Sequence, residues 1–164
     1  MSHHAEHTVT VEAPVELVWG VLVDVEGYSR IFPPTREVHL LEESPAHHVA
    51  RLHVDVGGEV QSWVSRRDID PQRHVIAYRQ LETAPIVERM GGEWRAFPLD
   101  AGRTQLVLTH DFAARQPVDG KVAGRFSFEE ADAMLQAAVA RNSVADLNAV
   151  KTEAERRADR TAVV

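Results

Sequence analysis

Hydrophobic and polar residues alternate over several short stretches of this chain, a period typical of β-strands with one buried face. The first stretch covers residues 7–12, and six more follow between residues 37 and 113. Turn-like residues separate them, and Gly57-Gly58 is the strongest hairpin signal. Because the connections are short, we expect sequential antiparallel strands. The six later ranges are 37–41, 48–56, 59–68, 74–82, 87–97 and 104–113.

Helical spacing of apolar residues appears at both ends of this strand-rich region. Residues 15–25 have it, directly after Pro14, which suits the first turn of a helix. A short second helix or turn is expected over 28–32. Near the other end, Ser127 and the glutamates that follow resemble a capping box. They predict one long helix over residues 128–157.

This order of elements predicts an α+β fold of the helix-grip type. A curved, seven-stranded antiparallel sheet would wrap around the long C-terminal helix, with two short helices between the first two strands. A cavity would then lie between sheet and helix. The length of 164 residues favours one domain over 1–164. We expect residues 1–6 and 158–164 to be flexible.

Composition excludes several classes of protein. The chain has no cysteine, which removes disulfides, thiol nucleophiles, thiolate zinc sites and iron–sulfur clusters. A formal net charge of −7 argues against a nucleic-acid or anionic-membrane binder. No apolar run approaches a membrane span, no leader segment is readable, and we expect a cytoplasmic protein.

Metal and cofactor motifs are also weak. His3, His4 and His7 are interpreted as a flexible terminus rather than a metal-binding tract. His47 and His48 would point to opposite faces of a strand and could not chelate together. No glycine-rich phosphate loop or His-Glu-x-x-His motif occurs. We therefore expect no metal and no cofactor.

A histidine interrupts the apolar face of the last predicted strand. His110 shares this face with Leu106, Leu108 and Phe112. An isolated histidine in such a place is more often a core residue with a satisfied partner. It can also be a functional group that faces a cavity.

The long helix repeats this anomaly. Asn142 and Asp146 lie one turn apart on the face that carries Leu135 and Val139. A carboxylate that faces the sheet is costly unless it is paired. Alternatively, the helix could be rotated by one residue, which would leave Asp146 at the edge in water.

Two adjacent arginines on the strand 59–68 point to opposite faces. Arg67 shares its face with Trp63 and Ser65, so it is the candidate for the inner side, and Arg66 is the candidate for the outer side. An exposed strand end with two solvated arginines is the alternative.

Aromatic and polar side chains together would line the predicted cavity. Such a mixture is typical of ligand pockets, although it also suits an ordinary core. The candidate binding residues are Phe32, Trp63, Ser65, Tyr78, Gln80, Met90, Trp94, Phe112 and Asn142.

Six segments, in their order and spacing, resemble the single-domain aromatase/cyclases of bacterial type II polyketide synthases. The resemblance runs from about His7 to Arg157. The segments are Phe32-Pro33-Pro34-Thr35, Trp63-Val64-Ser65-Arg66-Arg67-Asp68, Leu81-Glu82-Thr83-Ala84-Pro85, Gly92-Glu93-Trp94, Thr109-His110-Asp111-Phe112 and Arg141-Asn142-Ser143-x-x-Asp146-Leu147.

This resemblance implies an enzyme that folds a linear poly-β-ketone, delivered by an acyl carrier protein, in an interior pocket. First-ring aldol condensation and dehydration to an aromatic ring would follow, without a cofactor. It implies Arg67, His110 and Asp146 as catalytic residues, and contact with the ketosynthase complex is possible. Some relatives have a second arginine where this chain has Gln80, and some have a tyrosine near Thr35. Ring closure at carbons 7/12 or 9/14 therefore stays open.

The residue types suit that chemistry. We expect His110 to accept the proton of a methylene between two ketones and Arg67 to hold the oxygen that becomes an enolate. Asp146, if close, would orient the imidazole and favour its charged form.

Two functions without chemistry remain as alternatives. The same cavity could carry a lipid or an aromatic small molecule, because helix-grip folds also serve as binders. Alternatively, the chain could shape a synthase complex without an active site of its own, and it would then tolerate loss of Arg67 and His110.

Overall fold

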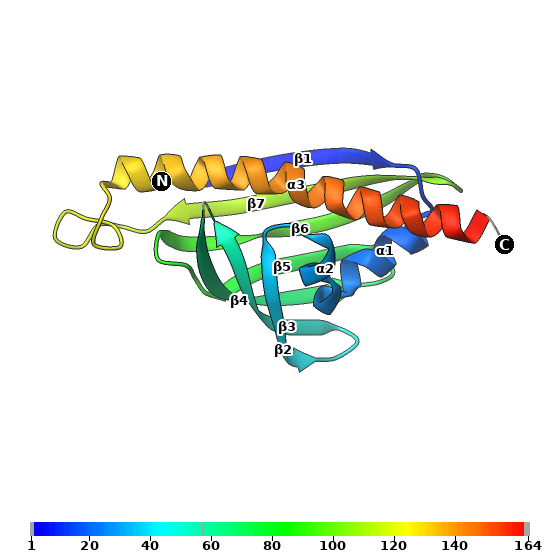
Figure 1. Ribbon diagram of the computed structural model, residues 1–164, viewed down its shortest axis with the longest axis horizontal. Helices are drawn as coiled ribbons and strands as arrows, with labels where there is room; N and C mark the ends of the chain where they lie inside the picture. The colour runs from blue at the N-terminus through cyan, green and yellow to red at the C-terminus, as the bar shows by residue number, and fades with distance from the viewer. Residues whose placement is uncertain (1, 57, 163–164) are drawn as a thin grey trace.

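The computed structural model describes residues 2–56 and 58–162, which form an antiparallel sheet and a long helix (Figure 1). The strands are β1 (His3–Val11), β2 (Thr35–Glu43), β3 (His47–Val56), β4 (Glu59–Asp70), β5 (Val75–Glu82), β6 (Val87–Asp100) and β7 (Arg103–Ala114). The helices are α1 (Val15–Val23), the 3₁₀ turn η1 (Val25–Gly27), α2 (Tyr28–Ile31) and α3 (Phe128–Ala162). The predicted α+β order is confirmed.

All seven strands belong to one sheet in the order β1-β7-β6-β5-β4-β3-β2. Each neighbouring pair is antiparallel. The first strand, β1, lies at one edge of the sheet and pairs with the last strand, β7. Figure 1 shows the rest of the sheet curving away beneath α3, which runs alongside β1 and β7. The predicted helix-grip arrangement is therefore confirmed. Of the expected Gly57-Gly58 turn, Gly57 lies outside the described residues.

Element boundaries differ from the pattern mainly at the two ends. β1 begins at His3 rather than His7, and its first residues pair with the end of β7, His3 opposite Phe112. At the other end, α3 continues to Ala162 rather than Arg157. Residues 3–6 and 158–162, which we expected to be flexible, lie in β1 and α3. The start of α3 agrees with the capping signal, since the Glu130 backbone N–H donates to Ser127 Oγ at 3.1 Å.

The apolar core fills one part of the space between sheet and helix. Val18 and Leu22 of α1 pack with Leu106 of β7 and Val150 of α3. A second cluster around Phe112 joins β6 and β7 to the first half of α3. Members of both clusters, Trp94 and Leu108 of the first and Met90 and Leu135 of the second, also line a cavity between sheet and helix. In the described part of the chain, no helix is long and apolar enough to cross a membrane.

Candidate functional site

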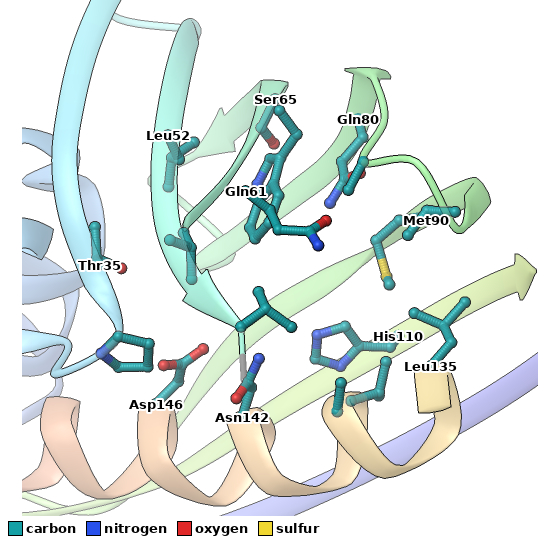
Figure 2. Close-up of a pocket in the computed structure, with 18 of the residues that line it drawn as sticks. Thr35, Leu52, Gln61, Ser65, Gln80, Met90, His110, Leu135, Asn142 and Asp146 are labelled. Atoms are coloured by element: carbon teal, nitrogen blue, oxygen red, sulfur yellow. The ribbon is translucent and has the colours of Figure 1, made fainter. Parts of the chain in front are cut away.

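A cavity of about 660 Å³ lies between α3 and the concave face of the sheet (Figure 2). Its wall is mostly apolar, and a few polar side chains from β4, β5, β7 and α3 point into it. Its volume lies within the roughly 300–1,000 Å³ that is common for small-molecule sites. Arg67, His110 and Asp146 all belong to this wall. The sequence prediction that these three residues face one cavity is therefore confirmed.

Arg67 is buried in the cavity wall at 4% exposure. Its Nη2 donates to Leu22 O at 2.7 Å and to Tyr28 Oη at 2.5 Å, and its guanidinium lies 4.9 Å from the centre of the Tyr28 ring. The neighbouring Arg66 points outward and pairs with Asp68 at 3.0 Å. Strand parity alone therefore assigned the two arginines correctly.

Two buried polar atoms of the cavity wall have no hydrogen-bond partner in the described residues. They are Nη1 of Arg67 and Oε1 of Gln80. A buried polar group without a partner costs about 1–3 kcal/mol, and both atoms are covered by their neighbours in this structure. Arg67 offers a donor that matches a carbonyl oxygen.

His110 extends from β7 into the cavity beside Asn142 and Leu135 (Figure 2). The pKa of His110 is lowered to about 4, mainly by burial and to a smaller extent by the neighbouring His7, while Asp111 partly opposes this shift. The imidazole is therefore neutral at neutral pH. Tyr78 packs against it edge-on, with the ring centres 5.8 Å apart.

The sequence left open whether His110 and Asp146 are in contact, and the structure does not pair them. In residues 2–56 and 58–162, neither a hydrogen bond nor an ion pair joins them, and His110 Nδ1 instead lies 3.3 Å from Ser143 Oγ. A pairing would favour the charged imidazole, whereas the pKa of His110 is lowered. In Figure 2, Asn142 stands between the two groups along α3.

Ser143 determines which nitrogen of His110 carries the proton. The Ser143 hydroxyl is fully buried and donates its hydrogen to Val139 O at 2.7 Å. Its oxygen is then an acceptor, so His110 donates from Nδ1–H. The Nε2 atom keeps its lone pair and can accept a proton.

We expect Ser143→Ala to remove the preference of His110 for one tautomer, because the imidazole loses the hydroxyl group that selects it. The ¹⁵N chemical shifts of the imidazole should show a mixture of both tautomers in this variant. Ser62→Ala, which removes a hydroxyl from β4 outside the cavity, serves as control. An unchanged imidazole spectrum in Ser143→Ala would contradict this role.

Asp146 lies one helical turn beyond Asn142 on the cavity face of α3 (Figure 2). Burial raises the pKa of its carboxyl group to about 7. Asp146 is therefore roughly half protonated at neutral pH and can both donate and accept a proton. The alternative in which a rotated helix leaves Asp146 in water is excluded by this position.

Most of the other predicted binding residues also line the cavity: Phe32, Trp63, Ser65, Tyr78, Gln80, Met90, Trp94 and Asn142. Phe32 and Trp94 stack nearly parallel, with centres 6.3 Å apart. Phe112 is the exception, because it is buried in the cluster with Met90 and Leu135 and packs on His3. Phe112 therefore packs against residues that line the cavity but does not line it itself.

Tyr28 and Ser143 are the functional residues that sequence analysis missed. Tyr28 holds Arg67 and itself donates to Leu22 O at 2.6 Å. Burial raises the pKa of Tyr28, which keeps the phenol neutral. For Ser143 a signal existed, since it follows Asn142 and precedes Asp146 by three residues, on the buried side of the helix. The contact of Tyr28 with Arg67 spans 39 residues, and no local pattern indicates it.

Gly92 of β6 lies where the backbone of β7 and the side chain of Tyr78 come very close. A Cβ atom there would collide with Thr109 O and approach the Tyr78 hydroxyl at 2.8 Å. Without it, Tyr78 Oη donates to Thr109 O at 2.6 Å. This bond fixes the Tyr78 ring against His110.

The chain is similar to several known proteins. Residues 11–139 match the family model described as polyketide cyclase/dehydrase and lipid transport. The granaticin polyketide synthase bifunctional cyclase/dehydratase of Streptomyces violaceoruber is 35% identical over 153 residues, or 93% of this chain and 44% of that protein. This chain thus spans less than half the length of that curated relative.

Solved structures show the same relationship. The crystal structure of Zhui aromatase/cyclase from Streptomyces sp. R1128 is 66% identical, with a TM-score of 0.95 over 96% of both chains. A START superfamily protein from Mycobacterium smegmatis is 18% identical and matches with a TM-score of 0.70 over 92% of this chain and 98% of that one. The second similarity concerns the fold alone.

Proposed function

This chain belongs to the polyketide cyclase/dehydrase family, and on that basis we propose that it acts as a polyketide aromatase/cyclase. It would close the first ring of a linear poly-β-ketone by an aldol condensation and then remove water to give an aromatic ring. The observation that carries the proposal is the cavity in which Arg67, His110 and Asp146 occur together. The cyclase/dehydratase and aromatase/cyclase names of the similar proteins support it.

The first step is proton removal from a methylene between two ketones. Neutral His110 accepts this proton at Nε2, while Nδ1–H stays bound to Ser143. The C–H electron pair moves into the enolate, whose oxygen gains charge next to the free Nη1 of Arg67. Since the imidazolium has a pKa of only about 4, it passes its proton on readily.

Ring closure forms a carbon–carbon bond. The enolate carbon attacks a second ketone of the same chain, and the resulting alkoxide takes the proton back from the His110 imidazolium to become a hydroxyl group. A folded chain in a fitted cavity brings the two carbons together, and such orientation can supply up to roughly 7–11 kcal/mol of the barrier.

Dehydration then requires an acid. Protonated Asp146, with its pKa near 7, donates a proton to the departing hydroxyl, which leaves as water. Neutral His110 accepts a ring proton, and the electron pair of that C–H bond forms the new double bond, so one water is released for each dehydration. This assigns Asp146 a role as an acid, in place of the role in orienting His110 that the sequence suggested.

The remaining expectations belong to the same proposal. Residues 1–164 would form one aromatase/cyclase domain that acts in the cytoplasm. The poly-β-ketone would arrive on an acyl carrier protein, and contact with the ketosynthase complex would shorten the transfer. The assignment of polyketide synthase names to the relatives supports a substrate of this class.

A reconstituted minimal polyketide synthase tests this proposal. Adding the wild-type protein should direct products toward one first-ring pattern, and spontaneous shunt products should fall. His110→Gln keeps the side-chain volume but removes the base, so most of the directed product should be lost. Circular dichroism would confirm that the variant is folded.

A binder without chemistry is the second candidate, and the lipid transport named in the family description favours it. A binder would shape the substrate through the apolar wall alone. Full direction of products by folded His110→Gln and by Asp146→Asn would support the binder and overturn the enzyme.

A further inference from the structure

We propose that Glu37, His39 and His53 form a binding site for a divalent transition-metal ion of the zinc type, on the outer face of the β2–β3 hairpin. One ligand atom from each of the three side chains lies within 4.8 Å of the others. The Nε2 atom of His39 is 3.4 Å from Oε2 of Glu37, and the imidazole rings of His39 and His53 are 5.5 Å apart. This site is separate from the cavity and does not depend on the proposed function.

A β-bulge creates this arrangement. Thr35 is buried in the cavity wall, and in a regular strand Glu37 would face the same way. The pairing of β2 with β3 shifts between Thr35 and Glu37, so the extra residue Arg36 turns the later side chains of β2 to the opposite face. Glu37 therefore faces outward, directly opposite His53, and His39 comes two residues later on the same face.

The cations nearest to the site are engaged elsewhere. Arg51, which lies opposite His39, binds Ser62 and Glu82 on the far side of β3, at 3.1 and 2.8 Å. Arg36 pairs with Asp55 at 2.9 Å. In residues 2–56 and 58–162, neither guanidinium pairs with the Glu37 carboxylate, whose partner is the proposed co-ligand His39.

The ligand types select the class of ion. Two imidazoles and one carboxylate suit zinc, nickel or copper, and water would complete the coordination. Magnesium and calcium prefer sites built from oxygen ligands, so they should bind far more weakly. Because the side chains are exposed or half-exposed, small rotamer changes can bring the ligand atoms to bonding distance.

We expect a bound metal ion to make the β2–β3 hairpin more rigid. β2 is an edge strand with two irregularities in its pairing with β3, and the inner faces of these strands carry Thr35, Leu52 and Val54 of the cavity wall. An ion that links Glu37 and His39 of β2 to His53 of β3 would hold this wall in place from outside.

The test uses the full chain after treatment with EDTA and removal of the chelator. Calorimetric titration with zinc chloride should show one site with a dissociation constant in the micromolar range. His39→Ala and His53→Ala should each weaken binding at least tenfold. His47→Ala, which removes a histidine at the far end of β3, should leave the constant unchanged.

A second measurement separates the site from binding elsewhere on the chain. Zinc should slow amide hydrogen exchange of β2 in the wild type but not in the His39→Ala/His53→Ala double variant. Equal zinc affinity in the wild type and a folded double variant would overturn the proposal, and so would the absence of binding below 1 mM.

Discussion

Arg67→Met should lower directed cyclisation by about 10²–10³-fold, whereas Arg66→Ala should leave it within about twofold of the wild type. The two residues are neighbours on β4, but Arg67 lines the cavity and Arg66 lies outside in an ion pair with Asp68. Of these two arginines, only Arg67 can donate a hydrogen bond to an enolate oxygen that forms inside the cavity. Product analysis in the reconstituted synthase measures both variants under the same conditions.

Arg67→Met should not lower the free energy of unfolding, although it lowers activity. In the described residues no carboxylate pairs with Arg67, and its Nη1 has no partner. Replacing a buried charge of this kind with an apolar side chain of similar length is often neutral or stabilising. We therefore expect Arg67→Met to match or exceed the wild type in thermal stability, although it has lost activity.

Arg67→Lys completes this comparison. Lysine keeps the charge but lacks the planar fork that reaches Leu22 O and Tyr28 Oη while it leaves Nη1 free. It should restore little activity. Similar losses for Arg66→Ala and Arg67→Met would contradict the placement of Arg67 at the reaction centre.

His110→Gln and Asp146→Asn should change the pH dependence of stability in opposite directions. The pKa of His110 falls from 6.5 to about 4 on folding, so the unfolded state binds more protons between these values. His110 therefore stabilises the wild type above pH 6.5, and this contribution is lost as the pH falls toward 4. His110→Gln should gain stability relative to the wild type at low pH.

Asp146 has the opposite effect on the pH dependence of stability. Its pKa rises from 3.8 to about 7 on folding, so the folded state binds more protons in this range. The protein loses stability as the pH rises through 7. Asp146→Asn should therefore gain stability relative to the wild type at pH 8, with little difference near pH 4.

Thermal unfolding of the three proteins between pH 4 and 8 measures both effects. Water can enter the cavity, so we expect each effect to be about 1–3 kcal/mol rather than the full value that the pKa shift corresponds to. This corresponds to several degrees in the unfolding temperature. If His110 and Asp146 were an ion pair, both variants would instead lose stability near neutral pH, which would contradict the separated groups seen here.

For His110, local patterns predicted the face of the strand but not the hydrogen-bond partner. Alternation along β7 correctly placed it on the inner face, and the helical period correctly placed Asp146 toward the sheet. Pairing the two required the tilt and rotation of α3 over β7, which depend on packing. The packing brings Ser143, rather than Asp146, to the imidazole.

Local patterns in the sequence were enough to predict the order of the elements and the helix-grip arrangement. They also predicted the face of the sheet that carries Arg67 and His110 and the face of α3 that carries Asp146. These properties depend on periods of two and 3.6 residues and on turn residues, all of which act over short distances along the chain. Three properties of the site required the folded molecule: the contact of Arg67 with Tyr28, the tautomer of His110, and the opposite pKa shifts of His110 and Asp146. Burial and hydrogen bonding between distant segments cause these properties, and both exist only once the sheet has closed over α3.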